Sequence, residues 1–373
     1  MLIGACALLL AAVLFRDYLL HGKASHDTAK IHYVAGLRAK EAGEDPAAYI
    51  RSQMRICFEH ERGDPDCYQQ AAKSFSQQFS FRFILDTFRG TESYPEVFSH
   101  CHAATHFLGR EAYGSTKSVS RSFAECNFTC HGGCYHGVLE AYFADRQSEH
   151  SNSDTALALE VKRMCGKKVD YTVPRIFGEC NHGIGHALMY ITGADLPRSL
   201  KLCDELPTRE QQEGCFSGVF MENSSSSTNH DHPSRYIKAD DPMYPCSTLE
   251  PRYLKICYRY QSSHFSLISN YDWQRVVDLC QKVPSEYRRE CFQTVGSNQV
   301  GYSADLIRAK ETCGLIVSQH FVDSCVRGVV DGLGGRYVGN VGADGNLLWS
   351  GRRCEQNNVL SAVRIYGGRL GSR

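Results

Sequence analysis

The sequence predicts an all-α protein, specifically an α-solenoid of about eight disulfide-linked helical hairpins with a period near 34 residues. Three observations predict this fold class: cysteines in regular pairs, helical apolar stripes before the first cysteine of a pair, and helix breakers between the two cysteines. The chain has 373 residues, 42% hydrophobic and 22% charged, which is ordinary for a folded protein with a large core. Lys+Arg and Asp+Glu both number 41. We therefore expect no nucleic-acid partner, because no net positive field attracts one.

Helix starts, apolar stripes and breakers surround the paired cysteines. Before Cys280, the residues Trp273, Val276 and Val277 lie at i, i+3 and i+4 of one helical face that reaches the cysteine at i+7. Aspartates at 195 and 272 stand where N-caps belong. A proline or a Gly-Asp-Pro turn lies near the midpoint of most pairs. Each pair therefore reads as helix, turn, helix.

Six cysteine pairs have spacings of 10 to 15 residues. In two antiparallel helices, residues equidistant from the turn lie side by side, and a disulfide needs Cα atoms about 4.4–6.8 Å apart. The spacing thus predicts one disulfide in each hairpin. The predicted pairs are Cys57/Cys67, Cys165/Cys180, Cys203/Cys215, Cys246/Cys257, Cys280/Cys291 and Cys313/Cys325. Cys101, Cys126, Cys130 and Cys134 can be joined in three ways that the sequence does not rank.

The second cysteines of these units recur at intervals of 34, 33, 46, 35, 42, 34 and 34 residues, counting Cys101 and Cys134 among them. A period near 34 with two helices in each unit is typical of an α-solenoid. In this layout the chain resembles tetratricopeptide and Sel1-like arrays, especially secreted cysteine-rich Sel1-like proteins. The resemblance is one of period and cysteine placement, covers most of residues 50–335, and implies paired helices joined by disulfides. Glycines three residues after the cysteine, such as Gly137 and Gly218, predict close helix contacts.

Eighteen cysteines favour an oxidising compartment. The apolar N-terminus predicts a signal peptide or signal anchor over residues 1–20, with the second alternative giving a single membrane anchor. We expect a linker over 21–46, the repeat domain over 47–335, and a Gly-rich segment with a C-terminal capping helix over 336–373. The expected localisation is extracytoplasmic: secreted, periplasmic or lumenal, with or without the N-terminal anchor.

Three consecutive units carry residues that commonly bind metals. The motif Cys-x-His-Gly-x-x-Glu at 134–140 recurs as Cys-x-His-Gly-x-x-His at 180–186. A less similar motif, Cys-His-x-x-x-His, lies at 101–106. In a helix, residues four apart share one face, so each pair can hold an ion from two sides. Adjacent helices lie about 8–10 Å apart, and six ligands from three helices suit a pair of ions better than one. The predicted ligands are His102, His106, His136, Glu140, His182 and His186.

The chemistry expected of this cluster is metal-assisted hydrolysis or oxidation by a divalent transition metal, with zinc, iron and copper all open. Glu140 is predicted as ligand or base, and Glu222 as a second base. The layout resembles deoxyhypusine hydroxylase, a helical-repeat protein that holds two irons with His-Glu motifs; the motifs here are His-x-x-x-His or His-x-x-x-Glu instead. The resemblance implies a dinuclear centre.

Three alternatives compete with a metalloenzyme. The histidines could be structural hydrogen-bonding residues, and Cys126-x-x-x-Cys130-His131 is close to a c-type haem attachment site. The third alternative is an extracytoplasmic scaffold without catalytic activity, since solenoids commonly bind a protein or peptide partner on a concave face. A bound ion distinguishes the first hypothesis from the scaffold.

Overall fold

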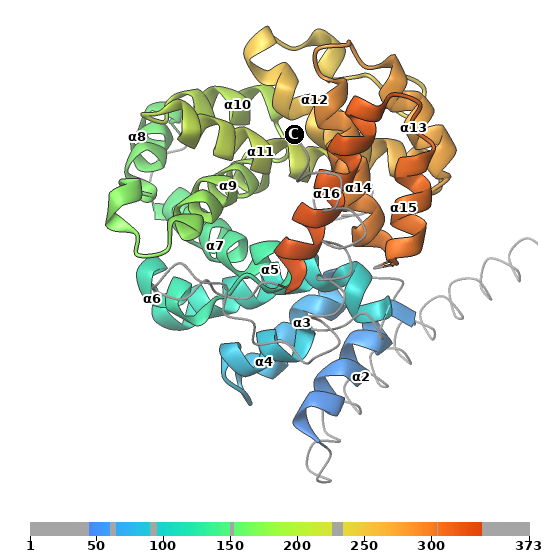
Figure 1. Ribbon diagram of the computed structural model, residues 1–373. Helices are drawn as coiled ribbons and strands as arrows, with labels where there is room; N and C mark the ends of the chain where they lie inside the picture. Colours follow the sequence, from blue (N-terminus) through green and yellow to red (C-terminus); the bar gives the residue numbers. More distant parts are fainter. Residues whose placement is uncertain are drawn as a thin grey trace, which may run out of the picture.

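The computed structural model describes residues 45–59, 65–89, 95–149, 153–225, 234–303 and 305–337. Within these ranges all regular elements are helices, 15 of them α-helices (Figure 1). The all-α prediction is confirmed, and helical repeats and disulfides are present; a solenoid of eight equal hairpins is not confirmed. The predictions for residues 1–20, for nearly all of the linker, and for residues from 338 onward lie outside the described residues. No described helix combines the length and apolarity needed to cross a bilayer.

Seven long helices form an inner series in which each packs against the next. In Figure 1 they lie toward the centre of the molecule, and shorter helices lie outside them. The long helices are α5 (Pro95–Thr116), α7 (Gly133–Glu149), α9 (Pro174–Ile191), α11 (Arg209–Ser225), α12 (Pro251–Ile268), α14 (Arg288–Ser303) and α16 (Gln319–Tyr337). The shorter outer helices are α6 (Val119–Glu125), α8 (Asp154–Met164), α10 (Leu196–Asp204), α13 (Trp273–Lys282) and α15 (Leu306–Gly314). The predicted N-caps Asp195 and Asp272 accept backbone hydrogen bonds at the starts of α10 and α13.

The inner series closes on itself. α16 packs against the short 3-10 helix η3 (Thr129–Gly132), and α14 contacts α5. A small rotation from each repeat to the next accumulates around a solenoid, and here it brings the last helices back to the first long one. Three N-terminal helices, α2 (Pro46–Glu59), α3 (Pro65–Ser76) and α4 (Phe81–Phe88), pack against α5. The described part of the chain is therefore a ring of helices with an inner face.

All six predicted cysteine pairs are disulfides, with Cα atoms 5.5–5.8 Å apart. The four cysteines whose pairing the sequence left open join as Cys101–Cys130 and Cys126–Cys134. These two bonds fasten η3 and the end of α6 to the long helices. Cys246 lies in the 3-10 helix η5 (Cys246–Thr248), so its bond joins a turn to α12. Cys165 likewise follows the last residue of α8. Four of the eight disulfides among the described residues thus do not join two α-helices, so the description as eight equal hairpins is too regular. Cys126 and Cys130, the two cysteines of the c-type haem alternative, are both disulfide-bonded and so offer no free thiol for haem attachment.

The inner helices approach one another closely at glycines. A Cβ on Gly137 would lie 1.8 Å from the carbonyl oxygen of His106, and one on Gly218 would lie 2.0 Å from that of His182. Any larger residue would therefore push α7 from α5, or α11 from α9. Two hydrophobic clusters fill the interior. The buried residues of one lie between Tyr49 and Val138 in the sequence, and those of the other between Leu139 and Val329. α7 contributes to both clusters, and its polar face between them carries the candidate site.

Candidate metal centre

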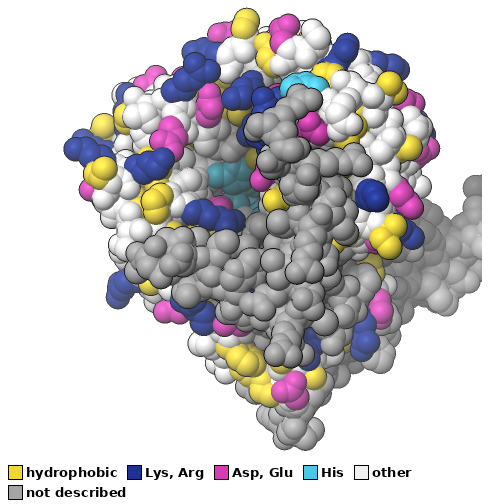
Figure 2. Space-filling view, viewed as in Figure 1, with side chains coloured by type: hydrophobic (Ala, Val, Ile, Leu, Met, Phe, Trp, Pro, Cys, Tyr) yellow, Lys and Arg dark blue, Asp and Glu magenta, His cyan; other side chains and the backbone are white. Residues whose placement is uncertain are grey.

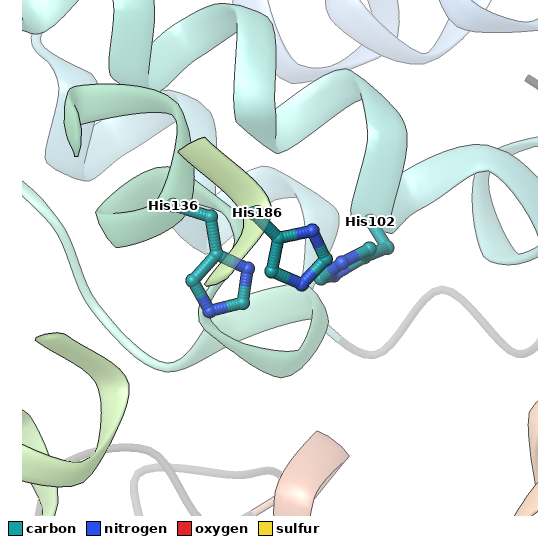
Figure 3. Close-up of side chains that lie close together, drawn as sticks. All are labelled: His102, His136 and His186. Atoms are coloured by element: carbon teal, nitrogen blue, oxygen red, sulfur yellow. The ribbon is translucent and has the colours of Figure 1, made fainter. Parts of the chain in front are cut away.

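The three predicted ligand pairs come together on the inner face of α5, α7 and α9. His106, His136, Glu140 and His186 are buried, with exposed fractions of 8%, 0%, 2% and 1%. Two groups of three side chains have ligand atoms that all lie within 4.8 Å of one another: His102, His136 and His186, which Figure 3 shows, and His106, Glu140 and His186. Either group could hold a metal ion. His182 belongs to neither group, but its Nε2 lies 3.1 Å from the Nε2 of His186.

The α5 pair has fixed tautomers. The Nδ1 of His102 lies 2.8 Å from the carbonyl oxygen of Cys130, and the Nδ1 of His106 lies 2.8 Å from Oε1 of Glu140. Both partners only accept hydrogen bonds, so each neutral ring carries its proton on Nδ1. The two Nε2 atoms then present lone pairs to each other, 3.1 Å apart.

The α9 pair repeats this arrangement. The Nδ1 of His186 lies 2.7 Å from Oε2 of Glu222, and that of His182 lies 2.6 Å from the hydroxyl of Ser217. Ser217 donates its own proton to the carbonyl oxygen of Gly214 and therefore accepts from His182. Again two unprotonated Nε2 atoms face each other at 3.1 Å.

Two lone pairs at this distance repel each other unless a metal ion or a proton lies between them. Ligand nitrogens bound to one ion at about 2.0–2.1 Å are about 2.9 Å apart at a right angle and about 3.4 Å apart at the tetrahedral angle. Both Nε2 separations lie within that range. A carbonyl or carboxylate behind Nδ1 is also what orients most metal-binding histidines. The residues present therefore fit a metal ion.

His136 offers a fifth nitrogen. Its Nε2 lies 3.3 Å from Oε2 of Glu179, so with Glu179 ionised the lone pair is on Nδ1. That Nδ1 is buried and has no hydrogen-bond partner among the described residues. The ring stacks on His186, with centroids 4.6 Å and planes 11° apart. A buried nitrogen without a partner is costly, and an ion beside it would remove that cost.

The pKa values of the cluster favour neutral imidazoles and charged carboxylates. Burial, with help from neighbouring imidazoles, holds the pKa values of His102, His136 and His182 well below their usual range. Burial alone would raise the pKa of Glu140, but His106 and Arg110 outweigh it and hold that pKa well below normal. The Nε of Arg110 donates to Oε2 of Glu140 at 2.9 Å. These are the protonation states that metal binding requires.

The same balance applies to Glu222, where burial would raise the pKa but the hydrogen bond from His186 lowers it. Glu179 differs, because burial raises its pKa to about 7 even though Arg175 opposes the rise. Its side chain is 15% exposed. Two low-pKa carboxylates and one carboxylate of intermediate pKa therefore surround the imidazoles.

A strained turn orients His102. Cys130 and His131 in η3 have φ values of 55° and 57°, and Gly132 follows at 73°. Non-glycine residues in this left-handed region cost about 1 kcal/mol or more each, and the turn is held by the Cys101–Cys130 and Cys126–Cys134 bonds. The strain lets the Cys130 carbonyl reach His102, and it brings the His131 ring to 6.4 Å from that of His102.

Sequence reasoning missed the roles of Arg110, Glu179 and His131 at the centre. Arg110 had a signal, since it lies four residues after His106 on the same helical face. Glu179 directly precedes Cys180 on α9, and its spacing from the predicted ligands did not mark it as part of the site. His131 was considered only for the haem alternative.

Figure 2 shows a hollow near the middle of the displayed face, with histidine side chains in its depth and Lys or Arg side chains at its rim. Of the predicted ligands, His102 and His182 are partly exposed and the other four are buried. Solvent can therefore reach the cluster at these two rings. No protein-family model, curated protein or solved structure matches the chain, so the layout is interpreted from its own geometry.

Proposed function

We propose that the protein is an extracytoplasmic metalloprotein that binds one or two divalent transition-metal ions and uses them for metal-assisted hydrolysis or oxidation. The observation that carries the proposal is the orientation of four imidazoles. Each imidazole donates its Nδ1 proton to an outer acceptor and turns its Nε2 lone pair inward. The rings form two pairs, and within each pair the two Nε2 atoms lie 3.1 Å apart. The proposed nitrogen ligands are His102, His106, His136, His182 and His186.

We assign Glu140 and Glu222 to orienting histidines. The sequence had instead predicted Glu140 as a metal ligand or base, and Glu222 as a second base. Each accepts the Nδ1 proton of a histidine on the preceding long helix. The second oxygen of Glu140 is occupied by Arg110, and a low pKa makes it a weak base. Such partners raise the donor strength of the ring and fix its tautomer.

Nitrogen donors without thiolate suit zinc, copper and iron. When bound, such an ion would polarise a substrate oxygen or lower the pKa of a bound water. The chain itself would aim five imidazoles inward, hold His102, His136 and His182 neutral, keep two buried carboxylates charged behind the rings, and admit substrate through the hollow. The eight disulfides support an oxidising, extracytoplasmic setting for this work.

Elemental analysis of purified, disulfide-intact protein tests the proposal. We expect one or two ions per chain after dialysis, and none in a His136→Ala, His182→Ala double variant. His264→Ala is the matched control: His264 is also buried but bonds the carbonyl oxygen of Lys238 instead. Wild-type protein that retains no zinc, copper or iron after each is offered would reject the metal centre and favour the scaffold. Oxygen consumption by iron- or copper-loaded protein would separate oxidation from hydrolysis.

A further inference from the structure

Glycines set the same register at two contacts between long helices. A glycine three residues after a second cysteine rests on the residue two positions after the preceding one: Gly218 rests on His182, and Gly328 on Gln293. A Cβ on Gly328 would lie 1.7 Å from the Gln293 carbonyl oxygen. The position two residues after the second cysteine therefore lies against the next long helix at these two contacts. It holds His136, His182, Ser217, Arg259, Gln293 and Arg327.

Side-chain contacts connect the candidate metal centre to α12. His182 bonds Ser217 on α11, and Ser217 in turn hydrogen-bonds Tyr260 on α12. The Tyr260 ring is 6.5 Å from the His182 ring. Arg259, the neighbour of Tyr260 in sequence, therefore stands one helix beyond the hydroxyl that orients a proposed ligand.

Arg259 has a buried hydrogen-bond donor that is unsatisfied. Its Nε is buried and has no hydrogen-bond partner among the described residues. The two arginines that contact the carboxylates of the centre differ, because Arg110 pairs with Glu140 and Arg175 with Glu179. A buried, unpaired guanidinium N–H costs free energy, and its planar fork matches the two oxygens of a carboxylate or phosphate.

We propose that Arg259 binds the oxyanion of a small substrate, a carboxylate or phosphate group, on α12 beside the candidate metal centre. The anion would satisfy the guanidinium, and the rest of the molecule would extend toward the imidazoles. Arg327 stands two residues after the second cysteine of its own unit, on α16, and is exposed. Only the extension toward metal rests on the proposed function; the anion site stands on Arg259 itself.

Isothermal titration of the full chain with inorganic phosphate and with acetate tests the site. We expect saturable binding of at least one anion to metal-free protein, weakened about tenfold or more by Arg259→Gln and partly restored in Arg259→Lys. Arg209→Gln is the control: its side chain is 85% exposed and pairs with Glu213, so affinity should not change. Thermal unfolding of each variant checks that the ring remains folded.

Two outcomes would overturn the inference: no saturable binding of either anion by the wild type, or equal affinity in Arg259→Gln. Because the metal-free protein is titrated, a chain that retains no metal would refute the proposed function and leave this result intact. Conversely, metal retention with no dependence on Arg259 would refute the anion site alone. Metal-loaded protein should bind the anion more tightly than metal-free protein if the two sites face each other.

Discussion

The α5 and α9 histidine pairs have the same geometry, but different groups accept the Nδ1 hydrogen bonds of their first histidines. In both pairs the Nε2 atoms lie 3.1 Å apart and the second histidine is held by a carboxylate from the next long helix. The first histidine differs. His102 depends on a main-chain carbonyl in a strained, disulfide-held turn, whereas His182 depends on the side chain of Ser217.

This difference separates two ways of orienting a ligand. A main-chain acceptor persists through most point substitutions but moves when the backbone turn relaxes. A side-chain acceptor is removed by a single substitution, which leaves the backbone in place. The α5 pair should therefore be sensitive to its disulfides, and the α9 pair to mutations on α11.

The largest effect should come from the imidazole that the two three-residue groups share. Among the described residues, His186 is the imidazole that belongs to both groups, and His186→Ala removes it. We expect metal affinity to fall by more than the roughly 10–100-fold typical of losing an orienting partner. Competition with a chromogenic chelator measures this, and an affinity equal to that of the wild type would remove His186 from the centre.

The two carboxylates should differ when each is changed to its amide. Glu140→Gln and Glu222→Gln each keep a carbonyl oxygen for the imidazole proton, and each should weaken metal binding about 10–100-fold. Glu140→Gln should be the more destabilising, because it leaves the partly buried Arg110 without its charged partner. Chelator competition and chemical denaturation measure the two quantities; equal loss of stability in both variants would contradict the role of Arg110.

Removing the disulfide behind His102 should affect both stability and metal binding. Cys101→Ser with Cys130→Ser should lower the free energy of unfolding by about 2–5 kcal/mol and weaken metal binding as the turn relaxes. Cys280→Ser with Cys291→Ser is the matched control, since that bond joins α13 to α14 away from the cluster. It should cost similar stability and leave metal affinity unchanged; if it weakens metal binding equally, the effect is global.

Acid should destabilise the metal-free protein. His102, His136 and His182 have lowered folded pKa values, so their stabilisation is complete above the unfolded value near 6.5 and is lost as the pH falls below it. Glu179 opposes this trend, because its pKa is raised to about 7 and the folded protein therefore binds one more proton there than the unfolded chain does. These four groups alone contribute a net of two protons, which corresponds to a slope of up to about 2.7 kcal/mol per pH unit below pH 6.5. Denaturation midpoints at several pH values measure it, and a flat profile would show that these rings are not buried neutral.

The smallest effect is expected from Ser217→Ala. It leaves the Nδ1–H of His182 without its acceptor while Glu222 still holds His186. We expect roughly a tenfold loss of metal affinity with little change in the unfolding free energy. Ser217→Thr, which retains the hydroxyl, should restore most of the affinity; a Thr variant as weak as the Ala variant would point to packing instead of the hydrogen bond.

Local sequence periodicity determined much of this molecule. The 3.6-residue period and the breakers between cysteines were enough to predict an all-α fold and six disulfides, because both depend on residues within one hairpin. The same period placed His136 with Glu140, and His182 with His186, on single helical faces. Glycines after the cysteines correctly indicated where helices touch.

Tertiary structure decided what depends on contacts between distant repeats. Ring closure arises from small rotations that add up over many repeats, and no local pattern encodes their sum. The pairing of Cys101 with Cys130, the capture of His106 by Glu140 34 residues away, and the Arg110 contact all require the helices to be packed first. Sequence alone thus identified which side chains share a helix face, whereas packing decided which nitrogen each imidazole presents to the interior.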